Sequence, residues 1–443
     1  MPNPILPLWE YIPDGEPRVF GDRVYLYGSH DTPGTDLFCD TKLKVWSASV
    51  DDLSNWQCHG HIFHTNPDSD HKSDTPWTDH RLFAPDVVEK DGKYYLYAYI
   101  QEALGCVAVS DKPEGPFELL STYKYNNANE AGDGGLFIDP GVLVDDDGRV
   151  YVYYGYLNSF MNELNPDNMY EVIDGTFKAH IMPEQDDVPK EKRYFEGSSP
   201  RKINGLYYFI YSPHECTRLA YATSTSPEGP FEYRGYIIDN GVDHPQGNDH
   251  GSLCKIKDQW YIFYHRMTNN TIMSRRACVE KVEILPDGTI PPVEMTCLGF
   301  DDYLSPYEIT KAEIACVVKG GCYVTEKDMF TRVVTNIKKD CVLGYKYFEF
   351  GEDYSTETML LSLNVKGMGC KAKVRVLIDD YENGTEIGSV DIGLADGVYQ
   401  ARVKNVTGRH AVYFVTEQPV KGWMADSFND KQLFEFDSFV FSK

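Results

Sequence analysis

The sequence predicts an all-β protein, a five-bladed β-propeller followed by a jelly-roll β-sandwich. Three observations support this fold class. A short hairpin pattern recurs five times in the first three hundred residues, the chain contains 32 tyrosines, and no long amphipathic helical pattern interrupts the repeats. Aromatic and β-branched residues favour strands, and a regular period of this length is typical of propellers.

Each copy of the repeat is a turn followed by an aromatic-rich strand, as in the second strand of a hairpin. One shared tyrosine marks each copy: Tyr25, Tyr95, Tyr151, Tyr208 and Tyr261. These markers lie 70, 56, 57 and 53 residues apart. Units of roughly 50–70 residues hold about four strands each, which is the size of a propeller blade. A β-sandwich would give many strands but not this period.

The repeat fades after residue 296, and we expect the propeller domain to span residues 1–303 and a second domain to span 304–443. Short alternating strands fill the second part, for example Gly344–Phe350 and Leu433–Phe441. A domain of short strands separated by turn signals is typical of a β-sandwich.

Composition limits the partners of the protein. Its 42 Lys and Arg against 68 Asp and Glu give a net charge of −26, which argues against nucleic acid or an anionic membrane. The N-terminus lacks a secretory signal and no apolar run approaches the ~18 residues of a membrane span, so we expect a cytoplasmic protein. The 11 cysteines show no paired CxxC spacing, which favours buried reduced thiols. The oligomeric state stays open.

A polar residue stands nine to twelve positions before each marker tyrosine: Asp14, Asp86, Asp139, Glu196 and His250. The first strand of a blade lines the central channel, so equivalent positions on successive blades should converge on one cavity. Carboxylates gathered there would differ in pKa, so that one stays ionised while another holds a proton near neutral pH. Paired acid–base hydrolysis requires this difference. The alternative is that these are turn or capping acids in an acidic chain; their shared register favours a site.

Four segments resemble glycoside hydrolase family 43: Ile12–Pro17, Phe83–Val87, Phe137–Gly141 and Phe195–Pro200, each followed by its hairpin. The resemblance covers about residues 1–300. It implies a five-bladed propeller and an inverting glycosidase that acts on xylose- or arabinose-containing glycans.

The resemblance also implies catalytic roles. Asp14 matches the general base, Asp139 the second aspartate that tunes the acid, and Glu196 the general acid. Phe83 takes the place of the aromatic wall of the sugar pocket. Glu16 remains a rival base, because proline usually follows the base directly whereas glycine follows here.

Further residues are expected to bind substrate. Arg275 matches an arginine that reaches the sugar from the fifth blade, with Arg276 as the neighbouring rival. Asp86 is expected near the substrate as a structural rather than catalytic acid, because its offset differs. His250 matches an axial histidine that in many members helps to hold calcium, so Ca²⁺ is the expected metal, with a second site in the sandwich as a further analogy. No organic cofactor is expected.

The second domain resembles family 6 carbohydrate-binding modules through Gly344–Phe350 and the closing Phe434–Phe439 segment. It would either grip polysaccharide through exposed aromatics such as Trp423 or Tyr381, or shape the mouth of the propeller. The second role is favoured, because an intracellular enzyme has little use for anchoring to fibre.

The leading functional hypothesis is an exo-acting xylosidase that releases xylose from the non-reducing end of imported β-1,4-xylo-oligosaccharides. An α-L-arabinofuranosidase acting on arabinoxylan or arabinan fragments is the nearest alternative, because a pentose pocket can accept both sugars. A non-hydrolytic glycan-binding propeller is disfavoured by three converging acids. The Asn66–His80 insertion is expected to be a solvated loop, with a wall of the pocket or a dimer contact as alternatives.

Overall fold

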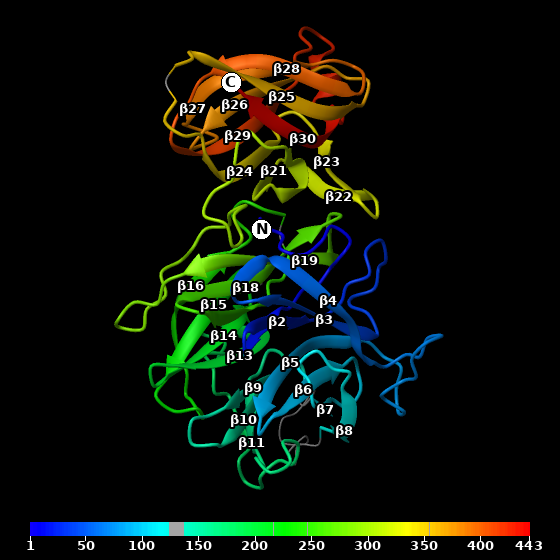
Figure 1. Ribbon diagram of the computed structural model, residues 1–443, viewed down its shortest axis with the longest axis vertical. Coiled ribbons are helices and arrows are strands. Elements are labelled where there is room, and N and C mark those ends of the chain that lie inside the picture. Colours follow the sequence, from blue (N-terminus) through cyan, green and yellow to red (C-terminus); the bar gives the residue numbers. More distant parts are fainter. Residues whose placement is uncertain (124–136, 216, 246, 354) are drawn as a thin grey trace.

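The protein is built from β-strands throughout the described chain, which confirms the predicted all-β class (Figure 1). The computed structural model describes residues 1–443 except 124–136, 216, 246 and 354. Within the described residues the helical segments are two short 3-10 turns, Ala312–Ile314 and Ala425–Phe428. None of these described turns has the length or the apolar character to cross a membrane.

Strands up to residue 282 form five antiparallel sheets, each made of consecutive strands. The first sheet holds β1 (Glu16–Phe20), β2 (Arg23–Gly28), β3 (Lys42–Ser49) and β4 (Asp52–His64). The second holds β5 (Leu82–Lys90), β6 (Lys93–Ile100), β7 (Cys106–Ser110) and β8 (Glu118–Thr122). The third holds β9 (Gly141–Val144), β10 (Val150–Tyr154), β11 (Phe160–Leu164) and β12 (Lys178–Ala179). The fourth holds β13 (Tyr194–Ile203), β14 (Leu206–Pro213), β15 (Arg218–Ser224) and β16 (Glu232–Asp239), and the fifth holds β17 (Ser252–Ile256), β18 (Gln259–Thr268) and β19 (Thr271–Val282).

The repeat seen in the sequence corresponds to the first hairpin of each sheet. All five marker tyrosines lie in the second strand of their sheet, namely β2, β6, β10, β14 and β18. The turn from β13 to β14 illustrates the local cause: Asn204 and Gly205 have φ values of 52° and 81°. Asn-Gly tolerates two positive φ angles in succession, so it closes a tight hairpin.

The first strands of the sheets lie next to one another. β1 contacts both β5 and β17, and β9 contacts both β5 and β13. The segments at the starts of these strands therefore lie close together.

The later strands form two further antiparallel sheets. One has the order β22 (Tyr323–Asp328), β23 (Thr331–Ile337), β30 (Phe434–Ser442), β25 (Thr358–Gly367) and β28 (Gly397–Lys404), with β20 (Thr310–Lys311) pairing with β30. The other has the order β21 (Val317–Lys319), β24 (Val342–Glu349), β29 (Arg409–Glu417), β26 (Ala372–Ile378) and β27 (Thr385–Ile392). The two sheets pack on each other, because the Phe439 ring lies 4.8 Å from the Tyr345 ring and 4.9 Å from the Phe414 ring.

Figure 1 places these two sheets, in yellow to red, beside the five N-terminal sheets. One hydrophobic core runs across the junction and includes Tyr264 and Cys297 from the first part and Val317 and Tyr345 from the second. A buried ion pair between Arg276 and Glu313 joins the two parts at 3.1 Å. The ten cysteines that the structure describes are free thiols.

Candidate active site

A pocket of about 210 Å³ opens at the place where the first strands of the five sheets begin. It is smaller than the roughly 300–1,000 Å³ of sites for drug-sized ligands, and suits a single sugar ring. Its lining combines acids, one arginine and several aromatics. The lining residues are Asp14, Phe38, Phe83, Tyr99, Ile138, Asp139, Tyr156, Glu196, Asn248, His250 and Arg275.

Two side chains hold the carboxylate of Asp14, which lies two residues before β1. The Ser29 hydroxyl donates to its Oδ2 at 2.6 Å, and Arg275 Nη1 donates to its Oδ1 at 2.8 Å. Burial works to raise the pKa of Asp14, but Arg275, His250, His265 and Ser29 outweigh it and hold the pKa below its ordinary value of 3.8. Asp14 is therefore a carboxylate at neutral pH.

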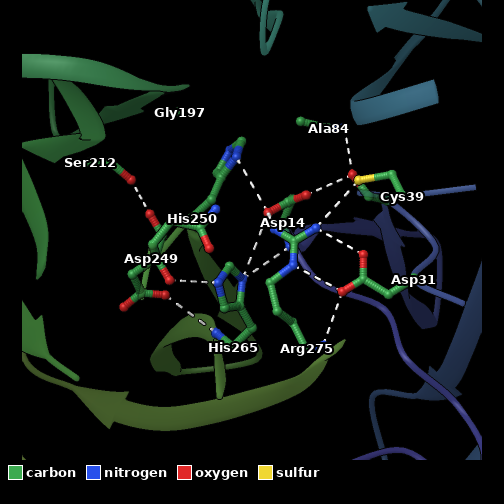
Figure 2. Close-up of polar contacts among 12 residues, drawn as sticks. Asp14, Asp31, Cys39, Ala84, Gly197, Ser212, Asp249, His250, His265 and Arg275 are labelled. Atoms are coloured by element: carbon green, nitrogen blue, oxygen red, sulfur yellow. Dashed lines mark hydrogen bonds and ion pairs between the residues drawn. The ribbon is translucent and has the colours of Figure 1, made fainter. Parts of the chain in front are cut away.

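Arg275 is fully buried and connects Asp14 to a second carboxylate (Figure 2). Its Nε and Nη2 each donate to Asp31 at 2.9 Å, while Nη1 donates to Asp14. A two-pronged bond of this kind fixes the plane of the guanidinium group. Arg275 thus lines the pocket as predicted, but its contacts hold Asp14 in position. Sequence reasoning missed Asp31, because it follows β2 in a loop outside the repeat.

His265 supports the backbone of Asp14. Its Nδ1 accepts from the Asp14 amide at 3.3 Å, and its Nε2 donates to the Asn248 carbonyl at 2.9 Å. Burial, reinforced by the positive charge of Arg275, lowers the pKa of His265 to about 3. The imidazole is therefore neutral and acts as a fixed acceptor for the amide of Asp14, whose φ is 55°.

Asp139 and Glu196 have the opposite character to Asp14. Burial and the negative charge of Glu196, opposed by His250, raise the pKa of Asp139 to about 7. Burial and Asp14, opposed by Arg275, raise the pKa of Glu196 to about 7. Asp139 Oδ2 accepts from the amide of Gly197 at 3.1 Å, directly beside Glu196 in the chain. Both acids therefore keep a large share of their protons near neutral pH, at which Asp14 is ionised.

His250 lies between the acids, with Nδ1 3.9 Å from Asp14 Oδ1 and 3.8 Å from Asp139 Oδ2. A calcium ion needs six to eight oxygen ligands. Among the residues that the structure describes, no group of three or more His, Cys, Asp or Glu is placed to hold a metal. A calcium ion near His250 would therefore have to take most of its ligands from carbonyl groups and water.

Asp86 and Glu16 lie outside the pocket lining, each paired with a partly buried arginine. Arg18 Nε and Nη2 donate to Asp86 Oδ1 at 3.0 and 2.8 Å, and the amide of Val142 donates to Asp86 Oδ2 at 2.7 Å. Arg201 Nη2 donates to Glu16 at 2.7 Å. The structure thus does not bring Asp86 to the substrate side, because its carboxylate is used within the protein.

Two aromatic groups face the pocket from different sheets. The Phe83 ring lies 5.8 Å from the Phe38 ring and 5.6 Å from the Tyr99 ring. On the other side the Tyr156 ring lies 4.9 Å from the Phe195 ring. Phe83, which the sequence predicted as an aromatic wall, is one member of the first group and lines the pocket. The sequence analysis did not identify Phe38, Tyr99 and Tyr156 as pocket residues. Phe38 and Tyr156 stand in loops after β2 and β10, where no fixed spacing from the marker tyrosines identifies a position.

The Asn66–His80 insertion is folded back on β4 and contributes no lining residue to the pocket. Its His71 ring stacks on the His64 ring at 3.9 Å, and the amide of Asp74 donates to the His64 carbonyl at 2.8 Å. The neighbour Arg276 also lies outside the pocket, in its pair with Glu313.

One ionised carboxylate facing protonated carboxyl groups, in an aromatic pocket of one-sugar size, provides what acid–base cleavage of a glycosidic bond needs. Fold and site together define a glycoside hydrolase. Residues 1–290 match the model of glycosyl hydrolases family 43, and the chain belongs to that family.

Known proteins agree with this assignment. The chain is 33% identical to a xylosidase/arabinosidase from Thermoclostridium stercorarium, over 93% of this chain and 95% of the relative. A β-xylosidase/α-arabinofuranosidase structure from a compost metagenome, in complex with xylotriose, is 26% identical over 66% of this chain and 99% of its own, with a TM-score of 0.54. An arabinoxylan arabinofuranohydrolase from Bacillus subtilis, solved with cellotetraose, shares the fold over 100% of this chain and 97% of its own, at 24% identity and a TM-score of 0.56.

Proposed function

We propose that the protein is an inverting exo-glycosidase that releases xylose from the non-reducing end of β-1,4-xylo-oligosaccharides. The observation that carries this proposal is the division of protonation states in one small pocket, with Asp14 ionised and Glu196 protonated. In our proposal the five N-terminal sheets are the blades of a propeller over residues 1–303, and their shared axis carries the site.

The reaction divides between two carboxyl groups. Glu196 gives its proton to the glycosidic oxygen as the bond from that oxygen to the anomeric carbon breaks. Asp14 takes a proton from a water molecule whose oxygen forms the new bond to the anomeric carbon from the opposite face. Arg275 keeps the carboxylate of Asp14 in place and ionised, and His265 holds its backbone amide. Asp139 fixes the backbone beside Glu196 through its bond to the amide of Gly197.

The volume of the pocket supports exo-action, because a space of about 210 Å³ suits one terminal sugar ring better than a chain passing through. An α-L-arabinofuranosidase is the second candidate. It is favoured by the relative from Thermoclostridium stercorarium, whose name includes both activities and whose match extends over nearly the whole chain.

Nitrophenyl β-D-xyloside and nitrophenyl α-L-arabinofuranoside separate the two candidates. We expect a higher kcat/KM for the xyloside, and a higher value for the arabinofuranoside would overturn the first choice. Failure to hydrolyse either glycoside or any xylo-oligosaccharide would overturn the proposed function as a whole.

For residues 304–443 we propose a jelly-roll sandwich, similar to family 6 carbohydrate-binding modules, that supports the propeller rather than anchoring it to fibre. Tyr381 supports the structural role, because it packs against Tyr413 and its hydroxyl accepts from Lys319 at 2.9 Å. Trp423 is 91% exposed and is the better candidate for sugar contact. Depletion of the protein by insoluble xylan that is lost in Trp423→Ala would favour the anchoring role instead.

We further propose a cytoplasmic enzyme that trims imported oligosaccharides. Fractionation of cells followed by the xyloside assay tests the location, and sedimentation of the purified protein measures the oligomeric state.

A further inference from the structure

The two aromatic groups of the pocket lie on different sides of the proposed reaction. Phe38 belongs to the side of the base, because the Arg275 guanidinium lies 4.3 Å from the centre of the Phe38 ring and the same guanidinium bonds to Asp14. Tyr156 belongs to the side of the acid, because it lines the pocket together with Glu196 and the amide of the next residue, Leu157, donates at 2.7 Å to the carbonyl of Phe195, which directly precedes Glu196.

These sides correspond to different parts of the substrate. In an inverting hydrolysis, the acid stands next to the oxygen of the leaving group, and the base stands on the opposite face of the sugar that is released. A side chain that borders the acid and faces the pocket therefore meets the leaving sugar. Tyr156 satisfies both conditions.

The backbone around Tyr156 holds the ring in a defined place. The amide of Gly155 donates to the Ile138 carbonyl at 2.9 Å, and the amide of Leu157 donates to the Phe195 carbonyl at 2.7 Å. The Tyr194 hydroxyl donates to the carbonyl of Gly155 at 3.0 Å. Both neighbours of Tyr156 are thus tied to the segments that carry the acids, so less of the chain has to be ordered when substrate binds.

Tyr156 is nevertheless 40% exposed, although it lines the pocket. An aromatic ring that is fixed through its backbone and support, but open on one face, presents a flat apolar surface at the mouth of the pocket. The faces of a β-linked xylopyranose are flat and carry C–H groups, which suits stacking on such a ring.

We propose that Tyr156, supported by Phe195, forms a binding subsite for the leaving sugar, a pyranose unit of the oligosaccharide. This inference rests on the proposed function and deepens it. It assigns recognition of the second sugar to the third sheet, whereas the first sugar is enclosed by Phe38, Phe83 and Tyr99.

Two substrates with the same xylosyl group and different leaving groups test the subsite. Xylobiose loses a xylose that would stack on Tyr156, whereas β-D-xylosyl fluoride loses a fluoride ion that cannot. For Tyr156→Ala we expect kcat/KM to fall roughly three- to tenfold on xylobiose and to stay within twofold on the fluoride. Tyr156→Phe keeps the ring and should keep the activity on both substrates.

Leu157→Ala is the matched control, because Leu157 is the exposed neighbour of Tyr156 and lies outside the pocket lining. It should leave both substrates unaffected. Equal losses on the two substrates in Tyr156→Ala, or the same selective loss in Leu157→Ala, would overturn the subsite and leave the proposed function intact. A wild-type enzyme that hydrolyses neither xylobiose nor the fluoride would overturn the proposed function, and the subsite with it.

Discussion

Replacing Glu196 with glutamine should remove the proton donor and leave the fold unchanged. The carboxyl of Glu196 lines the pocket, and it forms no ion pair with any residue that the structure describes. Glutamine has nearly the same shape, so we expect the free energy of unfolding to change by no more than about 0.5 kcal/mol.

The size of the effect on activity follows from the environment of Glu196. Its pKa is raised from 4.5 to about 7, so about half of the groups carry a proton at pH 7. An ordinary glutamic acid would be almost fully ionised at that pH, so the pocket keeps the proton-donating form available. General acid catalysis contributes roughly 10²- to 10⁴-fold, and we expect kcat/KM on xylobiose to fall by about that factor in Glu196→Gln.

The assay compares xylobiose with β-D-xylosyl fluoride at pH 6. Fluoride leaves without needing a full proton transfer, so Glu196→Gln should lose far less activity on the fluoride than on xylobiose. A thermal melt of the variant checks that the protein is folded. Retention of activity on xylobiose within a factor of ten, or equal losses on both substrates, would refute the role of Glu196 as the acid.

Three further predictions follow from the same site. In the wild type, kcat/KM on xylobiose should fall above a pH of about 7, because Glu196 then loses its proton. It should persist below pH 3.8, because the pKa of Asp14 is lowered and this base stays ionised there. A plateau of kcat/KM that reaches pH 9 would contradict this. Arg275→Lys keeps the charge but loses the two-pronged bond to Asp31, so we expect the free energy of unfolding to fall by about 1–3 kcal/mol. The drop of kcat/KM at acid pH should also begin at a higher pH than in the wild type. An unchanged pH for that drop would argue against the role of Arg275. Treatment with EDTA should lower kcat/KM and added Ca²⁺ should restore it, because Ca²⁺ is the metal expected near His250, and an unchanged kcat/KM would contradict that expectation.

The acids of the pocket could be found in the sequence because backbone geometry repeats from sheet to sheet. Asp14 and Asp139 have left-handed φ values of 55° and 48°, and both stand just before the first strand of their sheet. In the second sheet the residue with this conformation is Ala84, with a φ of 36°, eleven positions before Tyr95. Asp86 lies two residues further on, inside β5, and this shift turns its carboxylate toward Arg18.

The rest of the site comes from segments that have no register. Asp31, Phe38 and Tyr156 follow the second strands of their sheets, in loops whose lengths differ. Their positions depend on contacts with distant parts of the chain, such as the pair between Asp31 and Arg275, which are 244 positions apart. Only the folded chain brings such residues together, so the sequence predicted the acids and Arg275 but not Asp31, Phe38 and Tyr156.

The form of the xylose that is first released tests the paired roles of Asp14 and Glu196 most directly. Proton NMR during the first minutes of xylobiose hydrolysis distinguishes the two anomers before they interconvert. If a water molecule activated by Asp14 attacks opposite the leaving group, the newly released sugar is the α anomer. Initial release of the β anomer would contradict direct attack by water and the role of Asp14 as the base.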